Sequence, residues 1–250
     1  MIIANNWIPE QAKEKLLGLG NVIFLETEGI TYKAISGHPD IFFCNTKEGL
    51  IVAPNLPAKF REELNHYPIS FIEGKKPVGK DYPRTAFYNA VVTENYLIHN
   101  LKYTDNAILE AAENLKRINV NQAYTRCSLL PLPGDKFITS DRGIEKTLNN
   151  EGLEVLYVSP KDIILPGFEH GFFGGACGIY ENKLLILGSL KYFRDGVKLR
   201  KFLDKAKMEV VELYDGPLYD GGSIIVLSPI TDLICDGIRH KQFETALVSC

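Results

Sequence analysis

Several cysteine and histidine side chains are the groups in this chain that could carry out nucleophilic chemistry. A cysteine attacks as its thiolate, and a histidine can take up or deliver the proton that the reaction moves. The candidates are Cys127, Cys177, His170 and His38. A free cysteine is also commonly buried as a small apolar group, and a turn histidine, such as His38 before Pro39 and Asp40, is commonly only solvated. Both interpretations therefore stay open.

A second group of polar side chains could bind a small ligand. The candidates are Asp40, Asn89, Arg126 and Asp220, with Arg142 as a further arginine. A carboxylate can hold a planar cation through two parallel hydrogen bonds, and an arginine can hold a ligand carboxylate in the same way. Arginines near strand ends are more commonly solvated neighbours of acids. The two glycines after Asp220 allow close approach of a ligand, although an ordinary tight turn would have the same sequence.

The elements that must position these residues recur along the chain. A β-hairpin, a capped helix and a short apolar strand return in this order at a spacing of roughly 40 to 50 residues. The hairpins are predicted over 41–44 with 50–53, 86–92 with 96–99, 127–130 with 136–139, and 175–180 with 183–187. Helices begin near Asn55, Thr104, Ser140 and Asp195, and the strands that follow are predicted over 69–72, 119–123, 154–158 and 209–213.

The fifth unit is divided between the two ends of the chain. Residues 223–227 have no hairpin partner or helix after them, and residues 2–4 have no strand before them. We therefore predict that 1–4 and 223–227 pair in one sheet and close a ring. This gives a single domain over 1–250, with the fifth repeat split between 1–26 and about 209–229 and a C-terminal extension over 230–250. Two α/β domains divided near Asp141 are the alternative, but no Ser-, Gly- or Pro-rich linker marks that boundary.

Composition excludes several other classes of function. The net charge is −3 and the lysines and arginines are scattered, so nucleic acid is not an expected partner. No apolar run approaches the roughly 20 residues of a membrane span and no signal core is present, so we expect a cytoplasmic protein without a membrane partner. The five cysteines are odd in number and form no C-x-x-C motif. They are expected to be reduced thiols, and no metal site or cofactor is predicted.

A five-unit ring of this kind resembles the pentein superfamily, which includes arginine and agmatine deiminases, amidinotransferases and dimethylarginine dimethylaminohydrolase. The resemblance to the last of these is carried by four segments in the same order, which are residues 40–54, LKYTDN at 101–106, ACGIY at 176–180 and DGPLYDGGSII at 215–225. It covers residues 1–229. The fold it implies is α/β, a five-bladed α/β propeller of ββαβ-type repeats.

The resemblance also implies which positions would carry chemistry. In this superfamily a cysteine attacks a guanidine carbon, a histidine moves protons, and carboxylates bind the cation at a central cavity. Asp40 is similar to a family carboxylate and is predicted to face that cavity. The nucleophile position, however, falls on Gly222, the histidine position falls near Gln122, and an acidic position of the second repeat falls on 87–89. A glycine has no side chain with which to attack.

Three functions are compatible with these observations. The first is a catalytically degenerate pentein that binds a small guanidino, amidino or amino-acid-like ligand, or a protein partner, without hydrolysis. The second is an amidinohydrolase with a relocated cysteine nucleophile, which rapid thiol labelling near neutral pH would reveal. The third is a non-catalytic assembly role resembling that of the ribosome anti-association factor, which the lack of a basic surface signal disfavours.

Overall fold

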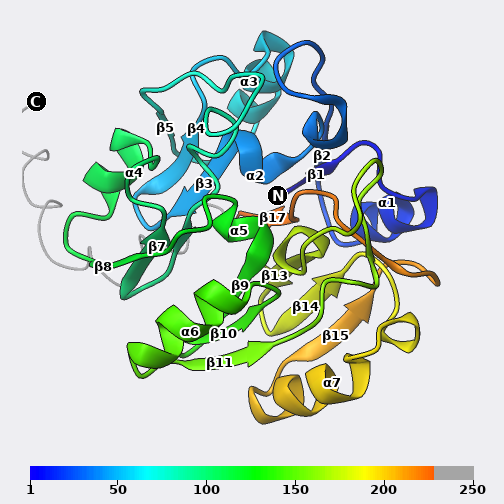
Figure 1. The fold of residues 1–250 in the computed structure, drawn as a ribbon. Coiled ribbons are helices and arrows are strands. Elements are labelled where there is room, and N and C mark those ends of the chain that lie inside the picture. Colours follow the sequence, from blue (N-terminus) through cyan, green and yellow to red (C-terminus); the bar gives the residue numbers. More distant parts are fainter. Residues whose placement is uncertain (228–250) are drawn as a thin grey trace, which may run out of the picture.

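The structure is a computed structural model that describes residues 1–227. The extension predicted over 230–250, with Cys235 and Cys250, lies outside the described residues. Within them the chain has a mixed α/β fold, with short strands towards the inside and the longer helices at the outside (Figure 1). No helix in this part of the chain is long and apolar enough to cross a membrane.

The three-stranded sheets of residues 1–227 share one construction. Two strands form an antiparallel hairpin, a helix follows, and a third strand returns parallel to the second. The first such unit contains β3 (Phe43–Thr46), β4 (Gly49–Val52), α3 (Ala58–Asn65) and β5 (Phe71–Glu73). The next three contain β6 (Val91–Val92), β7 (Tyr96–His99), α4 (Asn106–Ala111) and β8 (Lys116–Asn119); β9 (Leu129–Leu132), β10 (Lys136–Thr139), α6 (Arg142–Asn150) and β11 (Glu154–Tyr157); and β13 (Cys177–Tyr180), β14 (Lys183–Ile186), α7 (Gly196–Lys205) and β15 (Glu209–Glu212).

The remaining three-stranded unit joins the two ends of the described chain. β17 (Ile225–Val226) pairs antiparallel with β1 (Ile2–Asn5), which is followed by α1 (Glu10–Leu17) and then by β2 (Val22–Leu25), parallel to β1. The amino group of Met1 also donates to the carbonyl oxygen of Leu227 at 2.9 Å. The pairing of the two ends that the sequence predicts is therefore confirmed. A further pair of short strands, β12 (Ile163–Ile164) and β16 (Leu218–Tyr219), runs parallel.

Four hairpins are preceded by a tight turn that the sequence analysis assigned to strand. We call these segments the pre-hairpin turns; they are α2 (Pro39–Phe42), residues 86–90, α5 (Thr125–Ser128) and η2 (Gly174–Ala176). Each is closed by a backbone hydrogen bond, as from the N–H of Asn89 to the carbonyl of Ala86 at 3.2 Å. These turns have apolar residues because they are buried, and their sequences therefore resemble those of buried strands. The strand predicted over 119–123 is instead β8, whose exposed Lys116 and Arg117 interrupt the apolar pattern.

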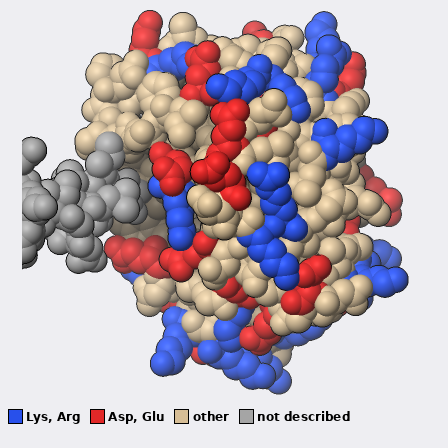
Figure 2. Space-filling model, turned by 90° about the vertical axis from the view of Figure 1, so that its left-hand side faces the viewer, with Lys and Arg blue, Asp and Glu red and all other residues tan. Residues whose placement is uncertain are grey.

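Apolar helix faces pack against the sheets as the helical spacing predicts. Leu199 and Leu203 of α7, and Ile144 and Leu148 of α6, are almost completely buried. Two of the shorter helical turns, η1 (Lys33–Ile35) and η3 (Leu190–Tyr192), lie in connecting segments. On the surface in Figure 2, Lys and Arg side chains alternate with Asp and Glu side chains, without a large patch of one sign on this face.

Asp105, the N-cap of α4, is expected to be a main determinant of stability. Its fully buried carboxylate accepts the backbone N–H groups of Ala107, Lys75 and Lys76 at 2.8–3.1 Å, and Tyr88 Oη lies 3.3 Å away. Asp105→Ala removes the acceptor of all three N–H groups and leaves the buried N–H of Ala107 unpaired, so the free energy of unfolding should fall by about 3 to 5 kcal/mol, as measured by urea denaturation.

The matched control for this substitution is Asp141→Ala at the start of α6. The Asp141 side chain accepts a single backbone N–H, that of Ile144 at 2.8 Å. Its loss should cost about 1 kcal/mol, as expected for an ordinary N-cap. Equal losses in the two variants would show that Asp105 acts only as a cap.

His99 is expected to make the fold sensitive to acid. Burial lowers the pKa of His99 from 6.5 to about 4, and its ring nitrogens lie 2.8 Å from Thr104 Oγ1 and from the carbonyl oxygen of Ala123. Since the folded state disfavours the proton, stability present above pH 6.5 is lost as the pH falls towards 4, by up to roughly 3 kcal/mol. Thermal unfolding of His99→Gln should depend less on pH over this range than wild type, whereas the exposed His66→Gln control should match wild type.

Candidate functional site

The pre-hairpin turns meet near the middle of the molecule, where α2, α5 and β17 lie close together in Figure 1. They are joined there by backbone hydrogen bonds between units. The N–H of Arg126 donates to the carbonyl of Asn89 at 2.9 Å, and the N–H of Asp40 donates to the carbonyl of Gly222 at 3.1 Å. The N–H of Ser223 donates to the carbonyl of Gly175 at 2.7 Å. Side chains from distant parts of the chain are thereby held at one point.

Asp40 is the centre of a buried polar cluster. Its Oδ2 accepts from Cys127 Sγ at 2.9 Å and from Ser223 Oγ at 2.6 Å. The Asn89 side chain donates to the carbonyl of Asp40 at 3.1 Å and to Cys127 Sγ at 3.3 Å, and its Oδ1 accepts from the N–H of Cys127 at 3.0 Å. Sequence reasoning selected Asp40, Asn89 and Cys127 but missed Ser223, whose only signal was its place in the Asp-Gly-Gly-Ser turn.

The Cys127 thiol is held in its neutral form by this environment. Burial raises the pKa of Cys127 well above its ordinary value, and the negative charges of Asp40 and Asp220 raise it further. Cys177 is also fully buried, and burial raises the pKa of its thiol. Cys177 lies in an apolar cluster rather than beside His170, so the structure does not bring together that sequence-neighbouring pair. Burial likewise raises the pKa of Cys44 to about 12.

Asp220 is a second fully buried carboxylate near this cluster. It accepts from the N–H of Phe172 at 2.8 Å and from the N–H of Gly222 at 3.0 Å. A Cβ atom at Gly175 would overlap the Asp220 carboxylate, so that glycine is needed to admit it. Burial raises the pKa of Asp220, His38 lowers it, and Asp40 raises it.

His38 fills the space next to Gly222, the residue at which the resemblance to the pentein superfamily places the nucleophile. Gly222 has φ +74°, and a Cβ atom built there would overlap His38 Cβ and Cγ. His38 is itself buried, and its Nδ1 makes no hydrogen bond to any residue of 1–227. The structure therefore leaves no room for a side chain at position 222, whatever its chemistry.

A cavity of about 270 Å³ lies against these groups. His38, Cys127 and Asp220 line it together with the aromatic residues Tyr32, Tyr124, Phe168 and Phe172 and with Ile35, Ile41, Leu165, Glu169 and His170. We call it the aromatic cavity. The rings of Tyr32 and Phe168 lie 5.9 Å apart, and Phe168 and Glu169 are exposed, so this side is open to solvent. The tyrosines were not singled out from the sequence, because single aromatic residues are common in any core.

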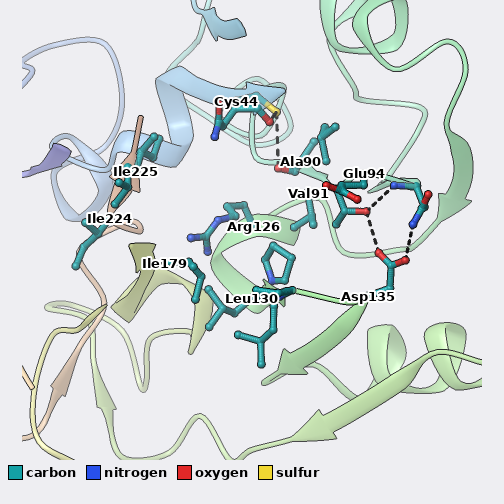
Figure 3. A pocket seen from close by; sticks show the side chains of 18 of the residues that line it. Cys44, Ala90, Val91, Glu94, Arg126, Leu130, Asp135, Ile179, Ile224 and Ile225 are labelled. Carbon is teal, nitrogen blue, oxygen red and sulfur yellow. Dashed lines mark hydrogen bonds between the residues drawn. The ribbon is translucent and has the colours of Figure 1, made fainter. Parts of the chain in front are cut away.

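A larger cavity of about 480 Å³ lies among the hairpins and includes Arg126, Cys44, Ile179 and Ile224 (Figure 3). Arg126 is half-buried, and its guanidinium donates to the carbonyls of Gly174 at 2.9 Å and Cys177 at 3.2 Å. These bonds tie the third unit to the fourth. A ligand-binding role for Arg126 stays a prediction. Arg142 lies on the surface, where it pairs with Glu145 at 2.7 Å.

Asp40 does not point into bulk solvent, since its side chain is completely buried. It lies behind Cys127 and is not one of the residues that line the aromatic cavity. His170 does line it, and the ring is half-buried with Nδ1 3.0 Å from the carbonyl oxygen of Gly171. The catalytic roles of His38, His170 and the cysteines, and the ligand-binding role of Asp40, stay predictions.

Comparison with known families gives a family without an assigned function. The model of a family described as "Family of unknown function (DUF6873)" matches residues 3–225. The chain belongs to this family. No curated protein matches its sequence significantly.

Solved structures show which fold the DUF6873 chain has. It is similar to dimethylarginine dimethylaminohydrolase of Pseudomonas aeruginosa complexed with citrulline, with 9% identity and a TM-score of 0.52 over 84% of this chain and 90% of that one. The agmatine deiminase of C. jejuni gives 10% identity and a TM-score of 0.51 over 85% and 86% of the chains. The amidinotransferase SxtG of Microseira wollei gives 11% and 0.50 over 88% of each. The resemblance to the pentein superfamily is thus confirmed at the level of the fold.

Proposed function

We propose that this DUF6873 protein binds a small organic cation of the guanidinium or amidinium type, free or on an amino-acid-like molecule, and does not hydrolyse it. The observation that carries the proposal is the aromatic cavity with the fully buried carboxylate of Asp220 at its wall. Its volume of about 270 Å³ is just below the range of drug-sized sites, which fits a ligand of amino-acid size.

The proposal includes the closure of the fold around this site. The five similar sheets would be the blades of a five-bladed α/β propeller, with the pre-hairpin turns at its axis. The pairing of β1 with β17 supports closure. The hydrogen bonds of Ser223 to Asp40 and of Arg126 to Gly174 join residues on opposite sides of Asp141, which supports one domain rather than two.

Charge and shape at the cavity favour a cation. Each Asp220 oxygen accepts one backbone N–H, and a carboxylate has further acceptor positions that a planar cation can fill. Tyr32, Tyr124 and Phe172 line the cavity, and aromatic rings attract cations through the negative potential of their faces. Glu169 adds a negative charge at the exposed side.

The absence of hydrolysis follows from the geometry of the possible nucleophiles. Position 222 carries no side chain and has no space for one. Cys127 does line the cavity with His38, which favours the second candidate function, a hydrolase with a relocated cysteine. Against it, burial and the negative charges of Asp40 and Asp220 raise the pKa of the Cys127 thiol well above its ordinary value, so the thiolate that must attack is disfavoured.

The proposal predicts that cationic ligands bind more tightly than a neutral analogue. Agmatine, arginine and guanidinium should give saturable heats in titration calorimetry, whereas the neutral urea analogue citrulline should bind at least tenfold more weakly. Asp220→Asn keeps the shape of the side chain and should lower the affinity for agmatine roughly 10- to 100-fold, because an ion-paired hydrogen bond is worth about 1.5–3 kcal/mol.

The control variant is Asp162→Asn, in which the altered carboxylate lies on the surface and pairs with Arg194. It should bind agmatine as wild type does. Heats that saturate with none of the three cations, or an affinity that Asp220→Asn leaves unchanged, would disprove the proposed function.

A further inference from the structure

Three potential metal ligands converge at the inner side of the aromatic cavity. His38, Asp40 and Cys127 each offer a ligand atom, these atoms all lie within 4.8 Å of one another, and all three side chains are buried. Asp40 and Cys127 come from two different pre-hairpin turns and His38 directly precedes the first, so no sequence spacing of the kind that marks zinc sites could have revealed them. The sequence analysis accordingly predicted no metal.

Two atoms of this cluster have no partner in the part of the chain that the structure describes. His38 Nδ1 and Asp40 Oδ1 are both buried and accept or donate no hydrogen bond there. Leaving a buried polar atom unpaired costs about 1–3 kcal/mol, and nearly all such atoms in folded proteins have a partner. Asp40 Oδ2, by contrast, has two donors. The two unpaired atoms therefore indicate an additional positive or donating group.

We propose that His38, Asp40 and Cys127 bind a divalent transition-metal ion, with Zn²⁺ as the best fit, and that its fourth coordination position faces the aromatic cavity. An imidazole nitrogen, a thiolate and a carboxylate are the donor types that zinc prefers, and calcium and magnesium avoid sulfur. Since His38 and Cys127 also line the cavity, the fourth position is accessible to a water molecule or a ligand. Sites with three protein ligands and one open position are typical of zinc that meets small molecules.

Binding would exchange one proton for the ion. The proton of the Cys127 thiol, now shared with Asp40 Oδ2 across 2.9 Å, is released to solvent as the Zn–S bond forms. The thiolate and the Asp40 carboxylate then balance the two charges of the ion. Asp220 remains as the negative charge for an organic cation, so the metal site goes beyond the proposed function without competing with it.

Neighbouring hydrogen bonds already fix the orientation of the ligands. Asn89 donates to Cys127 Sγ and accepts from the N–H of Cys127, and Ser223 donates to Asp40 Oδ2. Such outer hydrogen bonds are a regular part of zinc sites, where they hold the ligands in place. The cluster thus has both the ligands and the surrounding contacts of a metal site.

The test uses the full chain, freed of metal with EDTA and titrated with metal alone. Co²⁺ should bind once per chain and give an intense near-ultraviolet thiolate-to-metal charge-transfer band, and Zn²⁺ should displace it. Cys127→Ser should remove the band and weaken Zn²⁺ binding on the order of a hundredfold. Cys177→Ser, a buried cysteine outside the cluster, should keep both.

Two results would contradict the proposed metal site. No charge-transfer band in wild type, or a band that persists in Cys127→Ser, would show that this cluster does not bind the ion. If Cys127→Ser fails to fold by circular dichroism, His38→Asn takes its place with the same expected loss of Zn²⁺ affinity. Because no organic ligand is present, this result is independent of whether agmatine binds.

Discussion

The purified protein is expected to release no ammonia, methylamine or urea-type product from arginine, methylated arginines or agmatine. The covalent route of guanidine hydrolysis needs a thiolate at the guanidine carbon. The resemblance to the pentein superfamily places the nucleophile at Gly222, and burial and the charges of Asp40 and Asp220 raise the pKa of Cys127, a thiol that lines the aromatic cavity.

The expected loss of turnover is taken from enzymes in which the nucleophile has been removed. Such losses typically lower turnover on the order of a millionfold. Retained binding through Asp220 does not offset them, because holding substrate and transition state equally well leaves the chemical step unchanged. The expected rate is therefore indistinguishable from that of a buffer control.

The assay is run in EDTA, so that it tests the thiol route alone. Product release that disappears in Cys127→Ala or Cys177→Ala would show that a relocated cysteine acts as the nucleophile. If product is still released after both substitutions, Cys44 and Cys250 are the next thiols to substitute. Slow labelling of Cys127 by a thiol reagent at neutral pH is the accompanying expectation, because a buried neutral thiol reacts poorly.

Gly222→Ala is expected to lower the free energy of unfolding by about 3 to 5 kcal/mol. The φ angle of +74° costs a residue with a Cβ atom about 1 kcal/mol. The new Cβ would also overlap His38 Cβ and Cγ and lie 2.5 Å from His38 Cα. No side-chain rotation relieves a contact with Cα, so the backbone must move, and overpacking of this kind adds several kcal/mol.

Gly134→Ala provides the comparison, since Gly134 has the same φ of +74° and nothing within 4 Å of its added Cβ. Its expected loss in urea denaturation is about 1 kcal/mol. The double variant His38→Gly with Gly222→Ala should recover part of the stability lost by the single variant. If Gly222→Ala proves as stable as Gly134→Ala, His38 does not exclude side chains from position 222. The same overlap predicts that Gly222→Cys restores no hydrolysis.

The order of the elements was predictable from the sequence because it depends on local patterns. Hairpin turns, helix starts and apolar periodicity recur, and the incomplete units at the two ends indicated that residues 1–4 and 223–227 pair. The pre-hairpin turns were not predictable, because their apolar residues read as strand while the hydrogen bonds that close them leave no mark in composition. The helix predicted to begin near Asn55 begins at Ala58, and Asn55 itself exchanges hydrogen bonds with Val78.

The candidate site was predictable as a set of residues but not as an arrangement. Asp40, Asn89, Cys127 and Asp220 were selected for their chemistry, yet their convergence depends on tertiary contacts between units. Cys177 follows His170 closely in the sequence, but in the structure it belongs to an apolar core cluster. Ser223 was missed because a serine in a glycine turn carries no distinctive chemistry until its hydroxyl is seen against Asp40.

The bond between Ser223 and Asp40 also bears on how the protein is made. It joins positions 183 residues apart, and β1 pairs with the last described strand, β17. During synthesis on the ribosome, Asp40 and β1 emerge early, whereas their partners Ser223 and β17 are added only when most of the chain has been translated. Contacts of such long sequence separation form slowly and leave early segments exposed. The centre of the molecule is therefore the last part to be assembled, and a nascent chain that stops before residue 220 lacks both Asp220 and Ser223.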